Sequence, residues 1–324
     1  MSKKIYVLAA IVLALMFLTP FLGIIPIHWQ TIFKSNPSSF VFWQLRVPRT
    51  ILGFVAGSIL ALSGLVCQNL FKNDLATPDL LGISSGAAAG AVLALKFNLL
   101  VSFIGFGGLI LFSYLGALSS VFFVLLISRM VRNSSLYTFL MCGVALNFFY
   151  SALIVFFQYL FDFSNTFSLL RWLMGGISVV GYREIAFLGM LLFIFLFFVF
   201  LFKQEFLLAS AGDHFAQSRG LHVARFRIYS FLGLAFIVGA VVSICGPIGF
   251  IALIVPHVAR IWGQSNFHET VILSLLLGGG FLVLADFFAR ILMPPVEVPV
   301  GIITSLFGAP FFLILIISKL KKVE

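Results

Sequence analysis

Polar and ionisable residues that could do chemistry are concentrated in one short stretch of an otherwise apolar chain. Residues 67–87 read CQNLFKNDLATPDLLGISSGA, and the stretch combines amides, two Asp and one Lys with Pro and Gly. It separates two long apolar runs, so it is either an ordinary turn in water or the working part of a transport protein. The run from Ser84 to Gly90 also fits close helix packing, because small side chains let two helices approach.

Sequence signals of an enzyme or a metal site are missing. There is no His-Glu-x-x-His pair, no Gly-x-Ser-x-Gly turn and no Gly-x4-Gly-Lys-Ser/Thr phosphate loop. The three Cys lie singly within apolar runs, and the five His are scattered. We therefore predict that the chain is not an enzyme, that it binds no metal or cofactor, and that it has no ATP site of its own.

Asp286 is the only carboxylate inside an apolar run. Ion-coupled transport usually needs ionisable residues deep in the membrane, but Arg290 follows four residues later on the same helix face. This spacing favours an ion pair within the helix. An ion-coupled secondary transporter of a small metabolite and a membrane enzyme with an unrecognised site remain the alternatives, although the sequence offers little for an ion to couple to.

The composition indicates an integral membrane protein. The 324 residues are 62% hydrophobic and 9% charged, with a mean hydropathy of +1.18, whereas soluble domains are about a quarter charged. Long charge-free runs favour a polytopic, all-α class over a barrel of short alternating strands. The net charge of +10 is explained by cationic loops at the inner membrane surface, so no nucleic-acid partner is expected.

Nine apolar runs are expected to form ten membrane-spanning helices. About 20 residues are needed to cross the hydrocarbon, and Gly246-Pro247 divides one overlong run, because Pro breaks a helix interior. The first run is interpreted as a retained span, since no small-residue cleavage site follows it. The runs are 5–22, 47–71, 80–95, 106–128, 136–161, 185–202, 228–259 as two helices, 270–290 and 300–318.

An even number of spans places both termini on the same side of the membrane. Lysines near both termini predict that this side is the cytoplasm, and most of the 20 Lys and Arg then fall in inner loops. Two loops are longer than a turn. Residues 162–184 lie outside and predict a short surface helix, and residues 203–227 lie inside and predict one or two short helices. We expect a single transmembrane domain over residues 1–324.

Four stretches in order resemble the FecCD-type permeases of ABC importers for iron-siderophores, haem or vitamin B12. The first, residues 46–87, reads RVPRTILGFVAGSILALSGLVCQNLFKNDLATPDLLGISSGA. The others are CGPIGFIALIVPHVAR at 245–260, ADFFAR at 285–290 and EVPVGIITSLFGAPFFLILI at 297–316. The chain departs from the family at Asn73-Asp74, where Asn-Pro is usual, at Ala252, where Gly is common, and at Arg219-Gly220, where Leu-Gly is usual.

The resemblance implies a type II ABC importer permease in the bacterial cytoplasmic (inner) membrane. Its implied partners are a second permease copy or homologue, two ATPase subunits that bind ATP and Mg, and a periplasmic or lipoprotein solute-binding protein, besides membrane lipid. The implied substrate is a chelated iron compound, an iron-siderophore or haem, with vitamin B12 less expected.

The resemblance also implies roles for particular residues. The inner mouth of the path would use Asn73, Ser84, Ser85 and Gly86. The 203–227 loop would couple to the ATPase through Gly212, Ala216 and Gly220. The binding protein would dock on three outer arginines that we expect to face water, and their other possible role is lipid anchoring, in which the guanidinium reaches the headgroups. These arginines are Arg46, Arg49 and Arg290.

Overall fold

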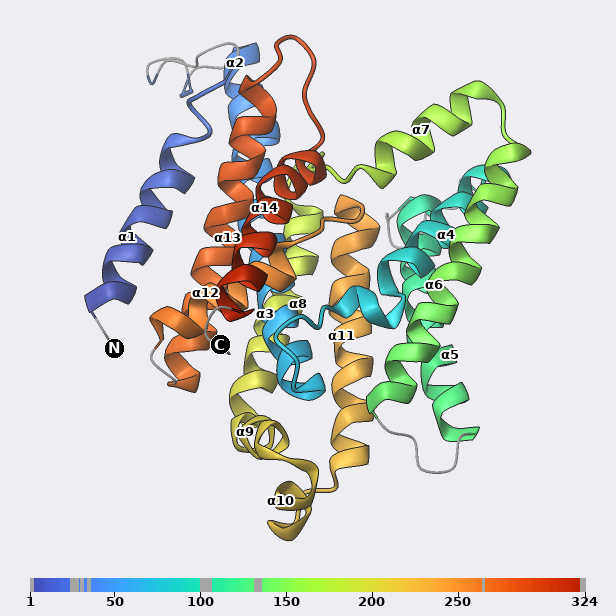
Figure 1. Ribbon diagram of the computed structural model, residues 1–324. Coiled ribbons are helices and arrows are strands. Elements are labelled where there is room, and N and C mark those ends of the chain that lie inside the picture. The colour runs from blue at the N-terminus through green and yellow to red at the C-terminus, as the bar shows by residue number, and fades with distance from the viewer. Residues whose placement is uncertain are drawn as a thin grey trace. The chain divides into compact units, whose positions relative to one another are not determined.

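The computed structural model of the chain describes residues 3–23, 29, 32–33, 36–99, 107–130, 136–263 and 266–320. All elements within these residues are helices (Figure 1). In chain order they are α1 (Lys3–Leu18), α2 (Pro37–Phe40), the π-helix η2 (Val41–Arg46), α3 (Val47–Phe71), the 3-10 helix η3 (Pro78–Leu81), α4 (Ile83–Lys96), α5 (Gly108–Met130), α6 (Leu136–Tyr159), α7 (Phe163–Leu173), α8 (Arg183–Leu201), α9 (Lys203–Ala211), α10 (Asp213–Ser218), α11 (Val223–Cys245), α12 (Ile251–Trp262), α13 (Phe267–Ile291) and α14 (Val300–Leu320).

Every run predicted to span the membrane overlaps a helix, with some differences at the ends, such as α1, which ends at Leu18 rather than at residue 22. Six helices among the described residues are long and apolar enough to cross a membrane: the continuous helix Pro37–Phe71, α5, α6, α8, α11 and α13. α4 and α12 have only 14 and 12 residues, so they are ~21 Å and ~18 Å long, against a hydrocarbon core of about 30 Å. The predicted all-helical membrane fold is confirmed, and the count of ten spans stays a prediction.

The chain forms two compact units, each assembled from segments that are far apart in the sequence. Unit 1 comprises Met1–Leu65, Met174–Leu192 and Ile248–Glu324, and unit 2 comprises Val66–Leu173 and Phe193–Pro247. The boundaries fall inside α3 and α8, so these two helices contribute residues to both units. The single domain expected over residues 1–324 stays a prediction.

In unit 1, the first part of α3 lies against α13. A Cβ atom at Gly57 would come within 2.3 Å of the Gly278 carbonyl oxygen, so only glycine fits there. The Ser58 hydroxyl donates a hydrogen bond to the Leu275 carbonyl at 2.9 Å. Close approach and polar contacts hold helices together in a membrane, where the lipid is as apolar as the side chains.

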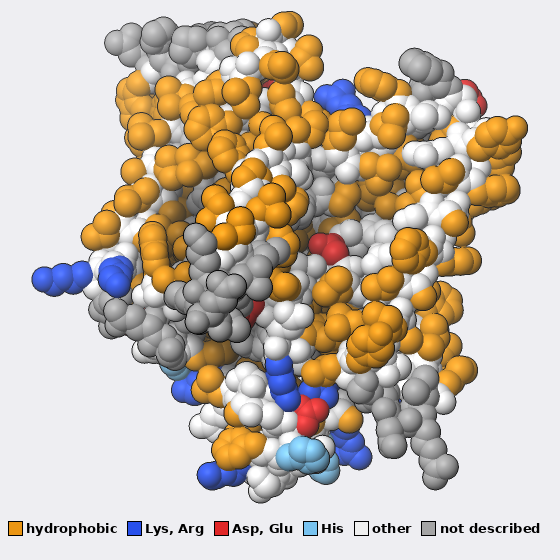
Figure 2. Space-filling view, viewed as in Figure 1, with side chains coloured by type: hydrophobic (Ala, Val, Ile, Leu, Met, Phe, Trp, Pro, Cys, Tyr) orange, Lys and Arg blue, Asp and Glu red, His pale blue; other side chains and the backbone are white. Residues whose placement is uncertain are grey.

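In unit 2, α4 packs against α5, α6 and α11. Cβ atoms at Gly86 and Gly90 would lie 2.5 Å and 2.0 Å from carbonyl oxygens of α5, so the small-residue run does serve close packing. Large apolar side chains on α5 and α6 point outward, including Phe122 and Phe148, which are 59% and 74% exposed. Figure 2 shows hydrophobic side chains over these helices, as expected for a surface that faces lipid.

Short helices occupy both of the longer loops. α7 lies in the 162–184 loop, and α9 and α10 lie in the 203–227 loop. Phe206 at 1% exposure packs on Phe226 of α11, with 4.9 Å between ring centroids. The aromatic contact therefore fixes α9 against the start of α11.

Candidate functional sites

The polar stretch of residues 67–87 folds as a broken connection between α3 and α4 in unit 2. Lys72 has a positive φ of 52°, directly after the end of α3. The Asn73 side chain accepts a hydrogen bond from the Leu75 amide at 2.9 Å, an Asx turn that needs no proline. Gly82, with a φ of 76°, turns the chain from η3 into α4. The departure at Asn73-Asp74 thus still allows a local turn.

A polar network links this connection to α6. The Ser84 hydroxyl donates to the Asp79 carboxylate, and the Ser85 hydroxyl donates to Asn147 Oδ1 at 2.6 Å. Asn147 in turn donates from Nδ2 to the Asp79 carbonyl at 3.1 Å. The Ser120 hydroxyl on α5 adds a bond to the Leu81 carbonyl at 2.9 Å. Non-helical backbone at membrane depth must be satisfied in this way or line a water-filled space.

The structure brings three of the four predicted gate residues into the first turn of α4. Ser84 and Ser85 are half-buried in the polar network, whereas Gly86 is buried against Gly116 of α5. Asn73 is exposed in the turn that follows α3. The sequence reasoning missed Asn147, and its signal was an amide inside the apolar run 136–161. A constriction formed by the four residues stays a prediction.

At the predicted coupling element, one carboxylate joins three parts of unit 2. Asp213, the first residue of α10, accepts from Arg227 Nη2 of α11 at 2.7 Å and from Lys72 Nζ beyond the end of α3. Partial burial of Asp213 raises its pKa, but the hydrogen bonds from Arg227 and Lys72 hold the pKa below its ordinary value. The element is therefore tied by charge to the helix that leads into the polar connection.

Two glycines give this element its turns. Gly212 and Gly220 have φ values of 140° and 85°, which L side chains rarely adopt. The Gly220 amide donates to Gln217 O at 2.9 Å and the Leu221 amide to Ala216 O at 3.0 Å, which closes the end of α10. Ala216 is fully buried. Figure 2 shows charged and His side chains gathered over α9 and α10, the kind of surface that suits a water-soluble partner.

Pro48 explains how the segment before α8 is attached near the predicted docking arginines in unit 1. Proline has no N–H, so it leaves earlier carbonyl groups of its helix without a donor, and here the π-helix η2 ends at Arg46, two residues before Pro48. The Gly181 amide donates to the Gln44 carbonyl at 2.9 Å, and the Tyr182 hydroxyl donates to the Trp43 carbonyl at 2.7 Å. The segment before α8 is thereby attached to this helix.

Side chains of α3, of α13 and of the loop between α13 and α14 form a cluster of ion pairs. Arg49 Nε and Nη2 lie 2.9 Å from Asp286 Oδ1, and Arg49 Nη1 lies 2.8 Å from Glu297 Oε2. Arg290 Nε is 3.2 Å from Asp286 Oδ2, so the predicted pair within α13 is confirmed. The sequence reasoning missed that Arg49 shares the same carboxylate, although the three charges stand at the ends of two apolar runs.

Burial separates the three predicted docking arginines. The Arg290 side chain is only 7% exposed and Asp286 3%, whereas Arg49 is 17% and Glu297 45% exposed. The expectation that all three arginines face water is therefore wrong for Arg290, because the buried Asp286 carboxylate requires a cation beside it. Arg46 is half-buried and donates from Nη1 to the Pro20 carbonyl at 3.2 Å. The docking role itself stays a prediction.

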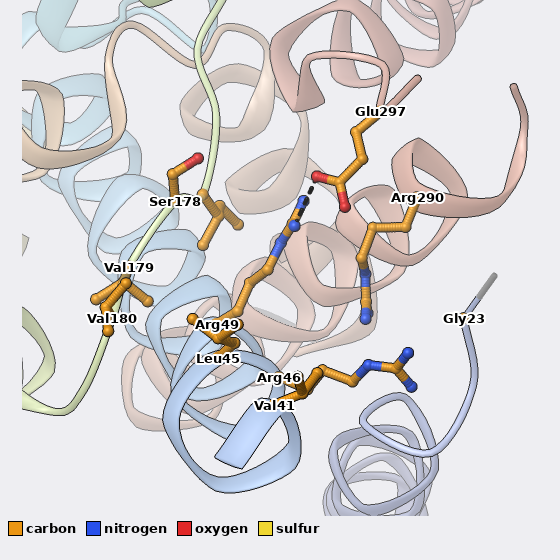
Figure 3. A pocket seen from close by; sticks show the side chains of 11 residues that line it. Gly23, Val41, Leu45, Arg46, Arg49, Ser178, Val179, Val180, Arg290 and Glu297 are labelled. Atoms are coloured by element: carbon orange, nitrogen blue, oxygen red, sulfur yellow. Dashed lines mark hydrogen bonds and ion pairs between the residues drawn. The ribbon is translucent and has the colours of Figure 1, made fainter. Parts of the chain in front are cut away.

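A pocket of about 550 Å³ lies beside this cluster (Figure 3). In Figure 3 Arg46 points toward Gly23, and Arg49 reaches up to Glu297. The pocket is thus lined by cations on one side and by the attached segment before α8 on another. Its lining residues are Gly23, Val41, Leu45, Arg46, Arg49, Ile177, Ser178, Val179, Val180, Arg290 and Glu297.

Comparison with known families decides the class to which this arrangement belongs. Residues 10–318 match the model of the FecCD transport family. The chain belongs to the FecCD transport family. Its membership and its membrane-length helices make the chain a multi-pass transmembrane permease.

Curated relatives match most of the chain. It is 35% identical to an iron chelatin transport system permease protein of Helicobacter pylori, over 85% of this chain and 82% of that protein. It is 34% identical to the vitamin B12 import system permease protein BtuC of Klebsiella pneumoniae, over 88% and 85%. It is 32% identical to the hemin transport system permease protein HmuU of Yersinia pestis, over 90% and 87%.

A solved structure extends the similarity to the whole fold. It is described as a metal-chelate type ABC transporter in an inward-facing conformation, and its chain is 28% identical to this one. The TM-score is 0.87, with 98% of this chain and 99% of that chain covered. The helices of this FecCD permease are therefore arranged as in a metal-chelate type ABC transporter.

Proposed function

We propose that the chain is the permease subunit of an ATP-driven importer that carries a chelated iron compound, an iron-siderophore or haem. The observation that carries this proposal is the similarity along the whole chain, from the family match over residues 10–318 to the metal-chelate transporter fold at a TM-score of 0.87. The substrate passes through unchanged, so the chain performs no covalent chemistry. It binds no cofactor, and ATP and Mg are bound by the partner ATPase.

The proposed assembly has two permeases, two ATPase subunits and a solute-binding protein that is periplasmic or a lipoprotein. The second permease is an identical copy or a homologue. The chain is a single domain with ten spans in the bacterial inner membrane, with both termini in the cytoplasm. The shorter helices α4 and α12 then cross the membrane together with the irregular segments before them.

In this proposal, each of the three sites has a separate function in transport. Asn73, Ser84, Ser85 and Gly86 contribute to the inner gate, and the element around Gly212, Ala216 and Gly220 docks on the ATPase. The ion pairs of Asp213 with Lys72 and Arg227 support this link, because they join α10 to residues beside the gate stretch. Arg46, Arg49 and Arg290 form the docking region for the binding protein, with Arg290 acting from a buried position.

The names of the relatives support a metal chelate as the substrate class, because they contain iron chelatin, vitamin B12 and hemin. An iron compound is preferred over vitamin B12. The test is uptake by vesicles that contain the complete transporter, with a radiolabelled ferric siderophore, haemin and cobalamin as the three probes. We expect one of the iron compounds to accumulate and cobalamin to stay outside. Accumulation of cobalamin alone would refute the iron assignment.

A further inference from the structure

A groove at the N-terminal end of α1 in unit 1 takes no part in the sites described above. Its volume is about 500 Å³. Figure 1 shows the start of α1 at the same end of unit 1 as the turn between α12 and α13. The lining residues are Lys3, Lys4, Val7, Leu8, Ile11 and Trp262.

The groove forms because α1 buries only one of its faces. Ile5 is 1% exposed and packs with Ala259 of α12 and Leu273 of α13. On the neighbouring face, Val7 and Ile11 are four residues apart, so they lie one above the other, and they are 59% and 52% exposed. These two side chains form an apolar wall that the packing of α1 leaves uncovered.

The open end of the groove carries positive charge. Lys3 and Lys4 are exposed, and no acidic side chain is among the lining residues. Figure 2 shows basic side chains projecting at the start of α1. Trp262, the last residue of α12, is 44% exposed, and Trp favours the boundary between headgroups and acyl chains. The groove therefore combines an apolar wall, a boundary Trp and a cationic mouth.

We propose that this groove is a binding site for one anionic phospholipid. An acyl chain lies along Val7, Ile11 and Trp262, and the headgroup phosphate lies against Lys3 and Lys4. The acyl chain alone gives no selectivity, because leaving the bilayer for the groove exchanges one apolar surface for another. The lysines supply it, because each basic residue near a membrane surface favours anionic lipid. The proposal does not depend on the transported substrate.

The test compares two lipids with identical tails, dioleoylphosphatidylglycerol and dioleoylphosphatidylcholine, bound to the purified full-length protein. Native mass spectrometry measures the lipid that is retained. We expect one phosphatidylglycerol to be retained in preference, by up to about 30-fold for two lysines. Lys3→Gln with Lys4→Gln should remove the preference. Arg129→Gln with Arg225→Gln, two exposed arginines of unit 2 that do not line the groove, is the matched control and should keep it.

A second measurement examines the apolar wall. Phosphatidylglycerol with brominated tails should quench the fluorescence of Trp262, which is identified as the signal lost in Trp262→Phe. Val7→Phe should reduce this quenching, because the larger side chain fills the groove. Thermal unfolding of each variant shows whether it is folded. Equal retention of the two lipids by the wild-type protein, or an equal loss of preference in the control variant, would reduce the groove to ordinary lipid contact and overturn the proposal.

Discussion

At the residue scale, the carboxylate of Asp286 is shared by two arginines from different helices. Arg49 reaches it from α3 and Arg290 from α13, at 2.9 Å and 3.2 Å. Since Asp286 is 3% exposed, the ion pairs satisfy a carboxylate that could not otherwise be buried. This cluster therefore joins the two helices at the proposed docking region, and it leaves Asp286 poorly suited to carry an ion.

The first prediction concerns the loss of this shared charge. Asp286→Asn leaves Arg49 and Arg290 close together without the carboxylate between them. We expect destabilisation of about 3–5 kcal/mol, the range for breaking a buried pair, measured as unfolding of the purified protein in detergent. Glu297→Gln is the control, and it should cost only ~0.2–1 kcal/mol because Glu297 is largely exposed. Equal effects of the two variants would contradict this account.

The second prediction concerns Glu297 as an internal competitor at the docking region. Its carboxylate occupies Arg49 Nη1 at 2.8 Å, where a carboxylate of the binding protein is proposed to dock. Glu297→Gln should therefore tighten docking by about 1.4- to 5-fold, the equivalent of one exposed ion pair. Surface plasmon resonance at low ionic strength measures it, and the gain should fade with salt. Glu297→Asp keeps the charge and should change docking less, whereas weaker docking of Glu297→Gln would rule out competition.

At the element scale, α4 depends on close contact with α5. A Cβ atom at Gly86 would lie 2.5 Å from the Gly116 carbonyl oxygen. The third prediction is therefore that Gly86→Leu lowers the yield of folded protein, because the helices must separate. Gel filtration of the detergent-purified variant measures the yield. A Gly86→Leu protein that is recovered in full, folded yield would contradict this packing requirement.

The proposed coupling element gives the fourth prediction, which concerns pH. The pKa of Asp213 is lowered by Arg227 and Lys72 against the effect of burial, so its ion pairs stabilise α10 at every pH above the ordinary carboxyl pKa of about 3.9. This stabilisation is lost only as the pH falls through the lowered folded-state pKa. Asp213→Asn should therefore loosen α10 equally from pH 8 to about pH 5.

Hydrogen exchange of the 213–218 amides in wild-type and variant protein measures this effect. The exchange rates should differ by a constant factor across that range, after correction for intrinsic rates. Arg225→Gln, an exposed charge change on α11, is the control and should leave α10 protected. A difference between wild type and Asp213→Asn that disappears already near pH 6 would contradict the lowered pKa.

At the scale of the whole molecule, hydropathy predicted the helices and single residues predicted the breaks. Gly246-Pro247 separates α11 from α12 as expected, because the broken helix follows from local chemistry. The pairing of Arg49 with Asp286, 237 residues apart, could not be predicted, because a sequence does not reveal which helices become neighbours. The sequence also did not predict that the helix containing α3 begins at Pro37, because Pro48 is typical of the first turn of a helix.

The resemblance supplied what residue patterns could not. Composition and charge gave a membrane protein without enzyme motifs, and several transport classes remained open. The ordered stretches at 46–87, 245–260, 285–290 and 297–316 selected one class, which the family match over residues 10–318 confirmed. In the proposed assembly, the substrate depends on the shape of a path formed by several chains, so the residues of one chain do not predict it.

The energy source for uptake most directly distinguishes an ATP-driven permease from an ion-coupled transporter. Vesicles with the chain, its ATPase subunits and its binding protein are supplied with a radiolabelled ferric siderophore or haemin, and either with enclosed ATP or with an imposed proton or sodium gradient. We expect accumulation with ATP and Mg, none with a gradient alone, and none when an ATPase subunit lacks its catalytic carboxylate. Accumulation that follows a proton or sodium gradient without ATP would contradict this expectation.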